Sequence, residues 1–349
     1  MKRKKSQLIN LIFFLVIAAA ISSCCSFDGS RYTGSVSDHF DGKHFHNQDS
    51  GTERSFWDFL EWQLTSSKGD WSDWWADPPG PKPTDRVYGD TLIVTFINHA
   101  TVLLQTNGIN ILTDPVWSES ISPIPLIGFD RHRPPGIRFR DLPHIDIVLI
   151  SHDHYDHLDI PTLNRLKKAY NPLFLVGLGN KGLMDEEGMT NTFELDWWQE
   201  KDFKNLKITF VPARHFSGRG LCDRNETLWG GYVIQAKGGP IYFAGDTGFG
   251  KHFKQIHNKF GPMRLSMLPI APIKPAWFMH EIHENPDDAV KAHKILHSKT
   301  SMAIHWGTFE QGDDGMLDPV LALEAIRKKE GISRNEFIIP SHGTGIKIE

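Results

Sequence analysis

Seven consecutive residues near the middle of the chain carry side chains suited to metal chemistry. They read Ser-His-Asp-His-Tyr-Asp-His at 151–157, directly after a run of apolar, β-branched residues. In an extended segment, residues two apart point to the same side, so His152 and His154 can bind one metal ion. Asp156 and His157 lie where the chain turns toward a helix, and they can serve a second ion. Imidazole and carboxylate ligands suit zinc, and a catalytic zinc site keeps one position open for water.

The elements that must position these side chains can be predicted from hydrophobic patterns. Short apolar runs bounded by Gly, Asn or Asp predict strands, and apolar residues at helical spacing predict helices. The expected strands lie at 92–97, 102–105, 109–112, 145–150, 173–176, 208–211, 232–235 and 241–244. The expected helices lie at 160–170, 287–296 and 319–329, the first with Asp159 as a cap ahead of Pro161. Strand runs followed by mixed strands and helices, twice over, predict a layered α/β sandwich.

The His-x-His-x-Asp-His string resembles the signature of the metallo-β-lactamase superfamily, and three later motifs match the remaining ligand positions of that family. Val-Pro-Ala-Arg-His ends at His215, Gly-Asp-Thr-Gly contains Asp246, and Ala-Ile-His-Trp-Gly contains His305. The resemblance implies a four-layer αββα sandwich of metallo-β-lactamase type with a two-ion centre. The implied ligands are His152, His154 and His215 on the first ion, Asp156, His157 and His305 on the second, and Asp246 between them.

Further stretches resemble the N-acylphosphatidylethanolamine-hydrolysing phospholipase D group within that superfamily. In that group a histidine follows Trp-Phe-Met and lies near the substrate phosphate; here His283 is the aligned residue and His280 is an unmatched neighbour. His99 and Asp114 are expected to orient the ligands from behind. The matching stretches lie at 98–101, 113–115, 194–198, 228–230, 243–248 and 301–309, within a resemblance that runs from about Phe56 to Gly343.

This closer resemblance implies a zinc-dependent phosphodiesterase of phospholipase D type. Such an enzyme hydrolyses N-acylphosphatidylethanolamine-like phospholipids to N-acylethanolamine and phosphatidic acid through a metal-bridged hydroxide. The implied catalytic residues are Asp156, Asp246 and His283, and the implied cofactors are two Zn²⁺ ions, although the same ligands accept iron or manganese. The segment between Trp117 and Arg140 departs from the family pattern, so the substrate is less closely defined than the reaction class.

Three alternatives remain open from the sequence. The same site could hydrolyse a lactone or a soluble phosphodiester instead of a phospholipid. A redox reaction, as in the di-iron members of the superfamily, usually goes with Glu at the second histidine position, where this chain has His154. A non-catalytic metal-binding surface lipoprotein would be expected to lack a ligand, whereas every matched ligand is present here.

The first residues have the pattern of an export signal. Four basic residues at 2–5 precede an apolar run at 8–21 that is shorter than the roughly 18 residues needed to cross a bilayer. The following Ile-Ser-Ser-Cys resembles a bacterial lipoprotein signal, which implies acylation of Cys24 and attachment to a membrane surface. We therefore expect a signal peptide at 1–23, a flexible tether at 24–54 and a hydrolase domain at 55–349, located at the outer membrane or its periplasmic face if the host is Gram-negative.

Between the tether and the first strand, aromatic residues crowd the segment at 56–75. Phe56, Phe59 and Trp62 have the spacing of a short amphipathic helix. The segment could contact a bilayer, since Trp suits a surface with one wet side and one apolar side, but we favour packing against the main domain.

The composition of the chain argues against nucleic-acid binding and against a disulfide within the hydrolase domain. The net charge of −4 over 349 residues gives no basic face for nucleic acid. Of the three cysteines only Cys222 lies in the hydrolase domain, so no disulfide within that domain is expected, and Cys222 is interpreted as a packed side chain rather than a nucleophile. The sequence leaves the oligomeric state open.

Overall fold

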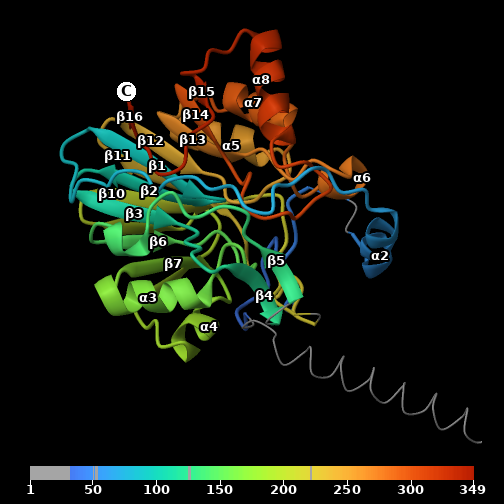
Figure 1. Cartoon of the computed structure of the whole chain (residues 1–349). Coiled ribbons are helices and arrows are strands. Elements are labelled where there is room, and N and C mark those ends of the chain that lie inside the picture. Colours follow the sequence, from blue (N-terminus) through green and yellow to red (C-terminus); the bar gives the residue numbers. More distant parts are fainter. Residues whose placement is uncertain (1–31, 50, 52–53, 125–126, 221) are drawn as a thin grey trace, which may run out of the picture.

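The fold consists of two seven-stranded sheets and a separate two-stranded hairpin, seen in a computed structural model of the chain (Figure 1). The structure describes residues 32–49, 51, 54–124, 127–220 and 222–349. The hairpin is formed by β4 (Ser120–Ile124) and β5 (Ile127–Asp130). Cys24 and the expected signal peptide lie outside the described residues.

The first sheet has the strand order β16-β1-β2-β3-β6-β7-β8. The strands from β16 to β3 pair antiparallel, and those from β3 to β8 pair parallel. Its strands are β1 (Leu92–Asn98), β2 (Thr101–Thr106), β3 (Ile109–Thr113), β6 (Ile147–Leu149), β7 (Leu173–Gly177), β8 (Thr192–Leu195) and β16 (Gly345–Ile348).

The second sheet repeats this plan in the order β15-β14-β13-β12-β11-β10-β9. Here β9 to β12 pair antiparallel, and β12 to β15 pair parallel. Its strands are β9 (Glu200–Phe203), β10 (Leu206–Val211), β11 (Gly231–Ala236), β12 (Gly239–Phe243), β13 (Leu265–Pro269), β14 (Thr300–Ile304) and β15 (Phe337–Ile338).

Helices cover the outer face of each sheet (Figure 1). Leu163 and Met184, on α3 and α4, pack in one core cluster with Phe174 of β7. Phe253 of α5 and Val290 of α7 pack in the cluster that holds the second sheet, and α8 lies against α7. The helices are α2 (Phe56–Thr65), α3 (Ile160–Tyr170), α4 (Lys181–Glu186), α5 (His252–Phe260), α6 (Ala276–Met279), α7 (Pro286–Ile295) and α8 (Asp318–Glu330), with a 3₁₀ turn η2 (Phe139–Asp141).

The main core lies between the two sheets. Along β2, Val102 and Leu104 face the other sheet, whereas Leu103 faces the helices on the outside. Successive strand residues point to opposite faces, so a strand buried on both sides is mostly apolar, as β2 is apart from Gln105 and its terminal threonines. The predicted four-layer αββα sandwich is confirmed, and each of the eight expected strands and three expected helices is present.

The expected flexible tether at 24–54 is wrong for residues 32–49, which we call the N-terminal strap. Phe40 and Phe45 are buried in the main core, with ring centroids 4.6 Å apart. The backbone N–H of Phe45 donates to the carbonyl of Asn225 at 2.7 Å. Two buried aromatic side chains remove several hundred square ångströms of apolar surface from water, on the order of 300–500 Å². That burial offsets the conformational entropy lost by an otherwise polar segment.

The aromatic segment divides into packed and exposed members. Trp62 of α2 stacks on Phe278 with ring centroids 5.0 Å apart, and its Nε1–H donates to Asp313. Trp71 donates from Nε1 to the backbone carbonyl of Asp314 at 2.7 Å. Packing therefore holds for these two residues, as favoured from the sequence. The exposed members are Trp57, Phe59, Leu64, Trp74 and Trp75.

Asp314, in the loop beneath Trp71, supplies a pH-dependent stability prediction. Burial raises the pKa of its carboxyl from 3.8 to about 6, although Oδ2 accepts the backbone N–H of Ile273. The folded state thus binds this proton more tightly than the unfolded state, and stability is lost as pH rises from about 4 to 6. We expect Asp314→Asn to raise the free energy of unfolding by about 1–2 kcal/mol at pH 8. At pH 4.5 the gain should be much smaller, as measured by urea denaturation.

The matched control is Asp318→Asn. A hydrogen bond from Lys274 lowers the pKa of Asp318, so this variant should lose stability at pH 8 instead of gaining it. Equal gains for Asp314→Asn at both pH values would contradict the prediction.

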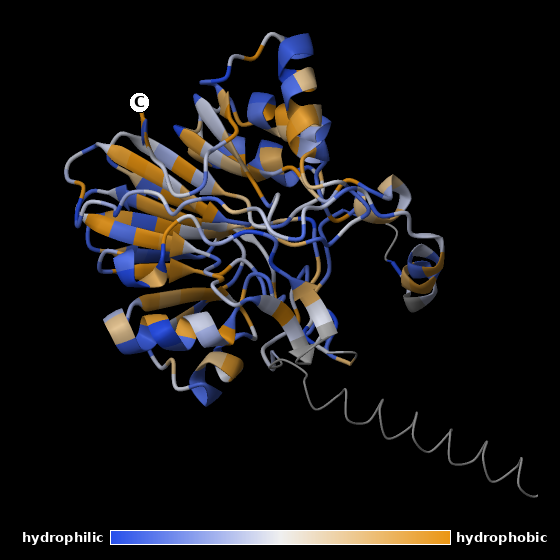
Figure 2. Ribbon diagram, in the orientation of Figure 1, coloured by the Kyte–Doolittle hydropathy of each residue, from blue (hydrophilic) through white to orange (hydrophobic). Residues whose placement is uncertain are grey.

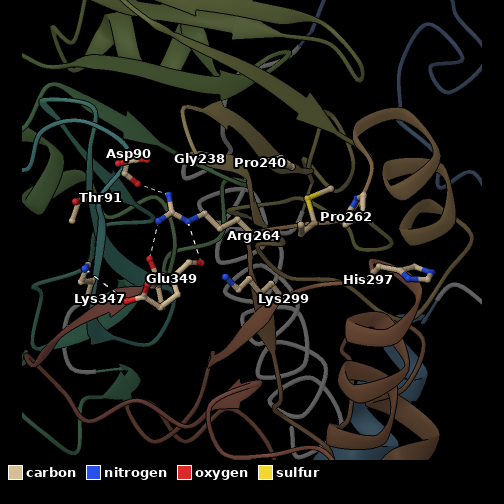
Figure 3. Close-up of a pocket in the computed structure, with 13 residues that line it drawn as sticks. Asp90, Thr91, Gly238, Pro240, Pro262, Arg264, His297, Lys299, Lys347 and Glu349 are labelled. Atoms are coloured by element: carbon tan, nitrogen blue, oxygen red, sulfur yellow. Dashed lines mark hydrogen bonds and ion pairs between the residues drawn. The ribbon is translucent and has the colours of Figure 1, made fainter.

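A hollow at one sheet edge has a structural role (Figure 3). This pocket of about 460 Å³ lies where β1, β12, β13 and β14 begin. Across it Arg264 donates to the backbone carbonyls of Asp90, Ile348 and Glu349, which ties the last strand to the second sheet. The expected metal ligands follow the carboxyl ends of β6, β10, β12 and β14, at the opposite edge of the sheets.

Cys222 takes part in a disulfide bond, which corrects its interpretation as a packed thiol. The other two cysteines, Cys24 and Cys25, both lie outside the described residues.

Among the helices that the structure describes, none combines the length and apolar character that crossing a bilayer requires.

Candidate metal centre

The candidate ligands meet because each follows the carboxyl end of a strand. The segment 151–157 continues from β6 and turns into α3, His215 follows β10, Asp246 follows β12, and His305 follows β14. These strand ends lie at one edge of the two facing sheets. The pairing of β12 with β13 and of β13 with β14 is parallel, which brings Asp246 and His305 to the same edge.

The first expected ligand set forms a group of three imidazoles. Nε2 of His152 lies 2.7 Å from Nδ1 of His154, and Nε2 of His215 lies 3.4 Å from the same Nδ1. Burial lowers the pKa of His154 and of His215 to about 3. Both side chains are therefore neutral near pH 7, which is the form that binds a metal ion.

The second expected set gathers around two carboxylates. Nε2 of His157 lies 3.2 Å from Oδ2 of Asp156 and 3.3 Å from Oδ2 of Asp246. Nε2 of His305 lies 3.0 Å from the same Asp246 oxygen, and Nε2 of His215 in the first set lies 3.8 Å from it. Asp246 thus stands between the two sets, where the family resemblance expects a shared ligand.

The negative charge of the Asp156 and Asp246 carboxylates favours a cation between the two ligand sets. Burial opposes a charge on His305, yet the Asp246 carboxylate raises its pKa to about 9. The same carboxylate, together with Asp156, raises the pKa of buried His157 well above its usual value. The two carboxylates therefore stabilise positive charge among the imidazoles, whether protons or metal ions carry it.

Several buried polar atoms of these residues lack hydrogen bonds, which fits a centre that holds two metal ions. Nε2 of His157 and Nε2 of His305 lie near Oδ2 of Asp246 without the geometry of a hydrogen bond, and Oδ1 of Asp246 is buried without a partner. Leaving a buried polar atom unpaired costs about 1–3 kcal/mol, so three such atoms pointing at one spot indicate a missing partner. Nitrogen and carboxylate oxygen donors of this kind suit zinc, and also iron or manganese.

Asp114 and His99 contact candidate ligands. Asp114 accepts hydrogen bonds from the backbone N–H and hydroxyl of Ser151, and its Oδ2 lies 2.6 Å from Nδ1 of His157. That contact turns Nε2 of His157 toward Asp246. Nε2 of His99 lies 2.9 Å from Oδ2 of Asp156, and its ring centroid is 3.8 Å from that of His305.

Three residues of the site hold strained backbone conformations. The φ angles of His99, Asp114 and His305 are 45°, 31° and 60°, in the left-handed region that side chains with a Cβ rarely adopt. Such a conformation costs on the order of 1–3 kcal/mol and persists only where the surroundings enforce it. The strain is consistent with side chains held in place for function.

His283 and its neighbour His280 lie in different surroundings. Nδ1 of His283 is buried without a hydrogen-bond partner and lies 3.7 Å from Oδ2 of Asp246. Burial lowers the pKa of His283 to about 3. His280 is exposed and lies beside Asp288 on the far side of the turn, with its Nδ1 3.3 Å from a carboxylate oxygen. The structure therefore brings only His283 to the site.

Sequence reasoning missed two polar residues that support ligands. Gln311 donates from Nε2 to Oδ2 of Asp156 at 2.8 Å. Asn47, in the N-terminal strap, donates to the carbonyl of His215 at 2.8 Å and accepts the backbone N–H of His215 at 3.1 Å. Its Oδ1 also accepts from Nε1 of Trp229 at 3.2 Å. No motif or period marks either residue, because both act across long sequence separations.

Removing the Asn47 side chain is expected to weaken metal binding. Asn47→Ala deletes both hydrogen bonds to the backbone of His215, and residues that support a ligand in this way are typically worth 10- to 100-fold in metal affinity. We expect roughly tenfold weaker zinc binding, measured by competition with a chromophoric chelator. Asn191→Ala removes similar hydrogen bonds to Asn171 and Pro172, away from the site, and should leave zinc affinity unchanged. Unchanged affinity in Asn47→Ala would contradict a supporting role.

Two basic residues of the segment 117–140 make structural contacts. Arg131 and Arg133 are buried, and Arg131 donates to the backbone carbonyls of Ser118, Val116 and Arg133. They hold the loop together. A groove of about 200 Å³ beside His215 instead has Arg54, Arg214 and Arg224 among its lining residues.

Comparison with known proteins agrees with this geometry. Residues 109–306 match the family described as Beta-lactamase superfamily domain. The chain is 41% identical over 266 residues to N-acyl-phosphatidylethanolamine-hydrolyzing phospholipase D 1 of Caenorhabditis elegans, covering 72% of this chain and 74% of that protein. It is 36% identical over 244 residues to a mitochondrial protein of that name from Saccharomyces cerevisiae, covering 68% of this chain and 52% of that protein.

Solved structures agree on the fold. A possible metal-dependent hydrolase from Veillonella parvula superposes with a TM-score of 0.60 at 17% identity, covering 73% of this chain and 99% of that one. The ligand motifs, the two facing sheets and these relatives lead to one conclusion. The chain belongs to the metallo-β-lactamase superfamily of metal-dependent hydrolases.

Proposed function

We propose that this hydrolase is a zinc-dependent phosphodiesterase of phospholipase D type. Its substrate would be an N-acylphosphatidylethanolamine-like phospholipid, cleaved to an N-acylethanolamine and phosphatidic acid. The observation that carries the proposal is the arrangement of two ligand sets around the single carboxylate of Asp246, with His283 beside both. The names of the relatives in Caenorhabditis elegans and Saccharomyces cerevisiae support the substrate class.

The protein side chains would divide the work as follows. Two metal ions, when bound, polarise a phosphoryl oxygen and make water a stronger nucleophile at neutral pH. Asp246 would orient the attacking water, because its carboxylate lies between the two candidate ligand sets. Asp156 is held in place by His99 and Gln311 and keeps its own orientation during the reaction.

His283 would stabilise the charge that develops on the phosphate. With a pKa of about 3 its imidazole is neutral near pH 7, so one ring N–H can donate to a phosphoryl oxygen while the other nitrogen accepts. Water oxygen forms the new bond to phosphorus, the bond from phosphorus to the ethanolamine oxygen breaks, and the leaving oxygen takes up a proton. Such placed donors contribute most where charge appears in the transition state.

The groove beside His215 would receive the polar part of the substrate. Its lining includes Arg54, Arg214 and Arg224 together with Asp49 and Glu281. Arg214 is paired with Glu281, and Lys251 is paired with Asp49. A groove with these charges suits a phosphodiester and its neighbouring amide better than acyl chains.

Attachment through Cys24 belongs to the same proposal. An acylated Cys24 would hold the enzyme at the membrane surface on which phospholipid head groups lie. Cys24 precedes the first described residue, Tyr32, by eight positions. At about 3.5 Å per extended residue, this connection reaches at most about 28 Å.

The test is hydrolysis of N-acylphosphatidylethanolamine in mixed micelles by the full chain, with mass spectrometry of the products and metal analysis of the protein. We expect release of N-acylethanolamine by the native chain and none by His154→Ala, which loses a ligand. A lactone and a cyclic phosphodiester are assayed in parallel. Hydrolysis of either of these without any N-acylethanolamine release, at two metal ions per chain, would replace the phospholipid substrate.

A further inference from the structure

Helix α2 has two apolar faces, and only one of them is packed. Trp62 lies against Phe278 and Met279 in a small cluster of its own. Trp57, Leu60 and Leu64 follow the spacing i, i+3, i+7 and form a second stripe on the helix. Trp57 is 73% exposed and Leu64 is 78% exposed. An isolated exposed apolar residue is ordinary, whereas a stripe along a helix indicates a contact surface.

Trp277, on the neighbouring helix α6, is a second partly exposed tryptophan near the start of α2. Its side chain is 42% exposed, and the guanidinium of Arg54 lies 5.9 Å from its ring centroid. Arg54 also donates to the backbone carbonyl of Phe278. Helix α2 stands out from the body of the protein beside α6 (Figures 1 and 2). We call Trp57, Leu60, Leu64 and Trp277 the α2 surface.

The α2 surface is directly connected to the candidate catalytic site. Helix α6 ends at Met279, and the backbone N–H of His283 donates to the Met279 carbonyl at 2.8 Å. Arg54 and its neighbour Gly51 line the groove that also contains His215. A molecule bound on the α2 surface therefore lies beside the entrance to the site.

We propose that the α2 surface docks on a phospholipid bilayer and holds the site entrance at the membrane. This inference rests on the proposed function, because it assumes a substrate that resides in that bilayer. Tryptophan and leucine suit the region where head groups meet acyl chains, and Arg54 at the edge suits lipid phosphate. The short connection from Cys24 to the N-terminal strap would keep the protein within reach of the same membrane.

A second copy of the chain fits this surface less well. Four partly exposed side chains of this size offer on the order of 400 Å² of contact. A stable protein interface needs about 800 Å² on each partner. A bilayer requires no matching area, since each inserted side chain contributes separately.

Contact with lipid is tested by fluorescence quenching with the full chain and vesicles of brominated phosphatidylcholine. Bromine on the acyl chains quenches tryptophan that lies close to them. Replacing Trp57 and Trp277 together with Phe keeps an aromatic ring at each position and removes both reporters. We expect this variant to lose more than half of the lipid-dependent quenching seen in the native chain.

The matched control replaces Trp74 and Trp75 with Phe. These residues are also exposed but lie outside the α2 surface, so quenching should remain as in the native chain. Unchanged quenching in the Trp57 and Trp277 variant, or its loss in the control variant instead, would overturn the proposal. So would a dimer of the native chain in sedimentation that dissociates when Leu64 is replaced by Asp.

A second measurement links docking to turnover. Leu64→Asp places a charge on the α2 surface and should lower hydrolysis of N-acylphosphatidylethanolamine in vesicles about tenfold, with hydrolysis of dissolved bis-p-nitrophenyl phosphate unchanged. Leu321→Asp is the control, at a position that is 60% exposed on α8. Equal vesicle rates for the two variants would contradict docking. If the native chain hydrolyses no phosphodiester, the proposed function fails, while the quenching result still decides the surface.

Discussion

Replacing Asp246 with Asn is expected to abolish hydrolysis and to empty the metal centre. One oxygen of Asp246 lies within 3.8 Å of the imidazoles of His157, His215 and His305, so a single change removes a ligand from both sets. The amide also removes the negative charge that favours cations there. We expect activity to fall more than about 10³-fold, beyond the 10- to 100-fold typical of residues that only support a ligand. Metal analysis should find fewer than one ion per chain.

The control for Asp246→Asn is Asp153→Asn. Asp153 belongs to the same motif and is equally buried, but its carboxylate accepts from the backbone N–H of Gly218 and the hydroxyl of Thr227. It holds the loop that follows His215 and faces away from the ligands. This variant should lose stability and keep its metal content. Two bound ions in Asp246→Asn, with activity within tenfold of the native chain, would refute the shared-ligand role.

Replacing His283 with Ala is expected to lower kcat about 10²- to 10³-fold while both metal ions stay bound. The expected loss is that of one hydrogen-bond donor placed at developing charge. His283 lies next to Asp246 but belongs to neither of the two expected ligand sets. Metal content measured alongside kcat and KM separates this role from that of a ligand.

Two further variants sharpen the test of His283. His283→Gln keeps an N–H donor and should recover part of the lost rate. His280→Ala removes the exposed neighbour, which pairs with Asp288, and should change kcat less than twofold. Loss of one metal ion in His283→Ala would instead make His283 a ligand, a possibility raised by its grouping with His215 and Asp246.

The sequence identified candidate ligands where they occur in local motifs, and the structure brings these side chains together. His152, His154, Asp156 and His157 lie within six positions, so their spacing is visible without knowledge of the fold. Strand β6, which leads into them, is buried on both faces and therefore appears as an apolar run. Strand β13 was missed because Ser266 breaks its apolar run and a proline ends it.

Residues that act over long sequence separations escaped prediction. Asn47 and Gln311 are ordinary polar residues in sequence, and their roles follow only from contacts with His215 and Asp156. The N-terminal strap was predicted to be flexible because polar residues dominate its composition. Two phenylalanines, Phe40 and Phe45, outweigh that composition once the body provides a core for them to enter.

The contact between the strap and His215 also bears on the order of folding. Asn47 and His215 are 168 residues apart, so their hydrogen bonds close a very long loop. Contacts of this kind form late, since the entropy of closing the loop must be overcome before they add stability. The chain emerges from synthesis with Asn47 before His215, yet His215 gains this support only after both sheets have assembled. Full metal affinity is therefore expected to mature as one of the last events of folding, which would delay the appearance of activity until the strap has docked.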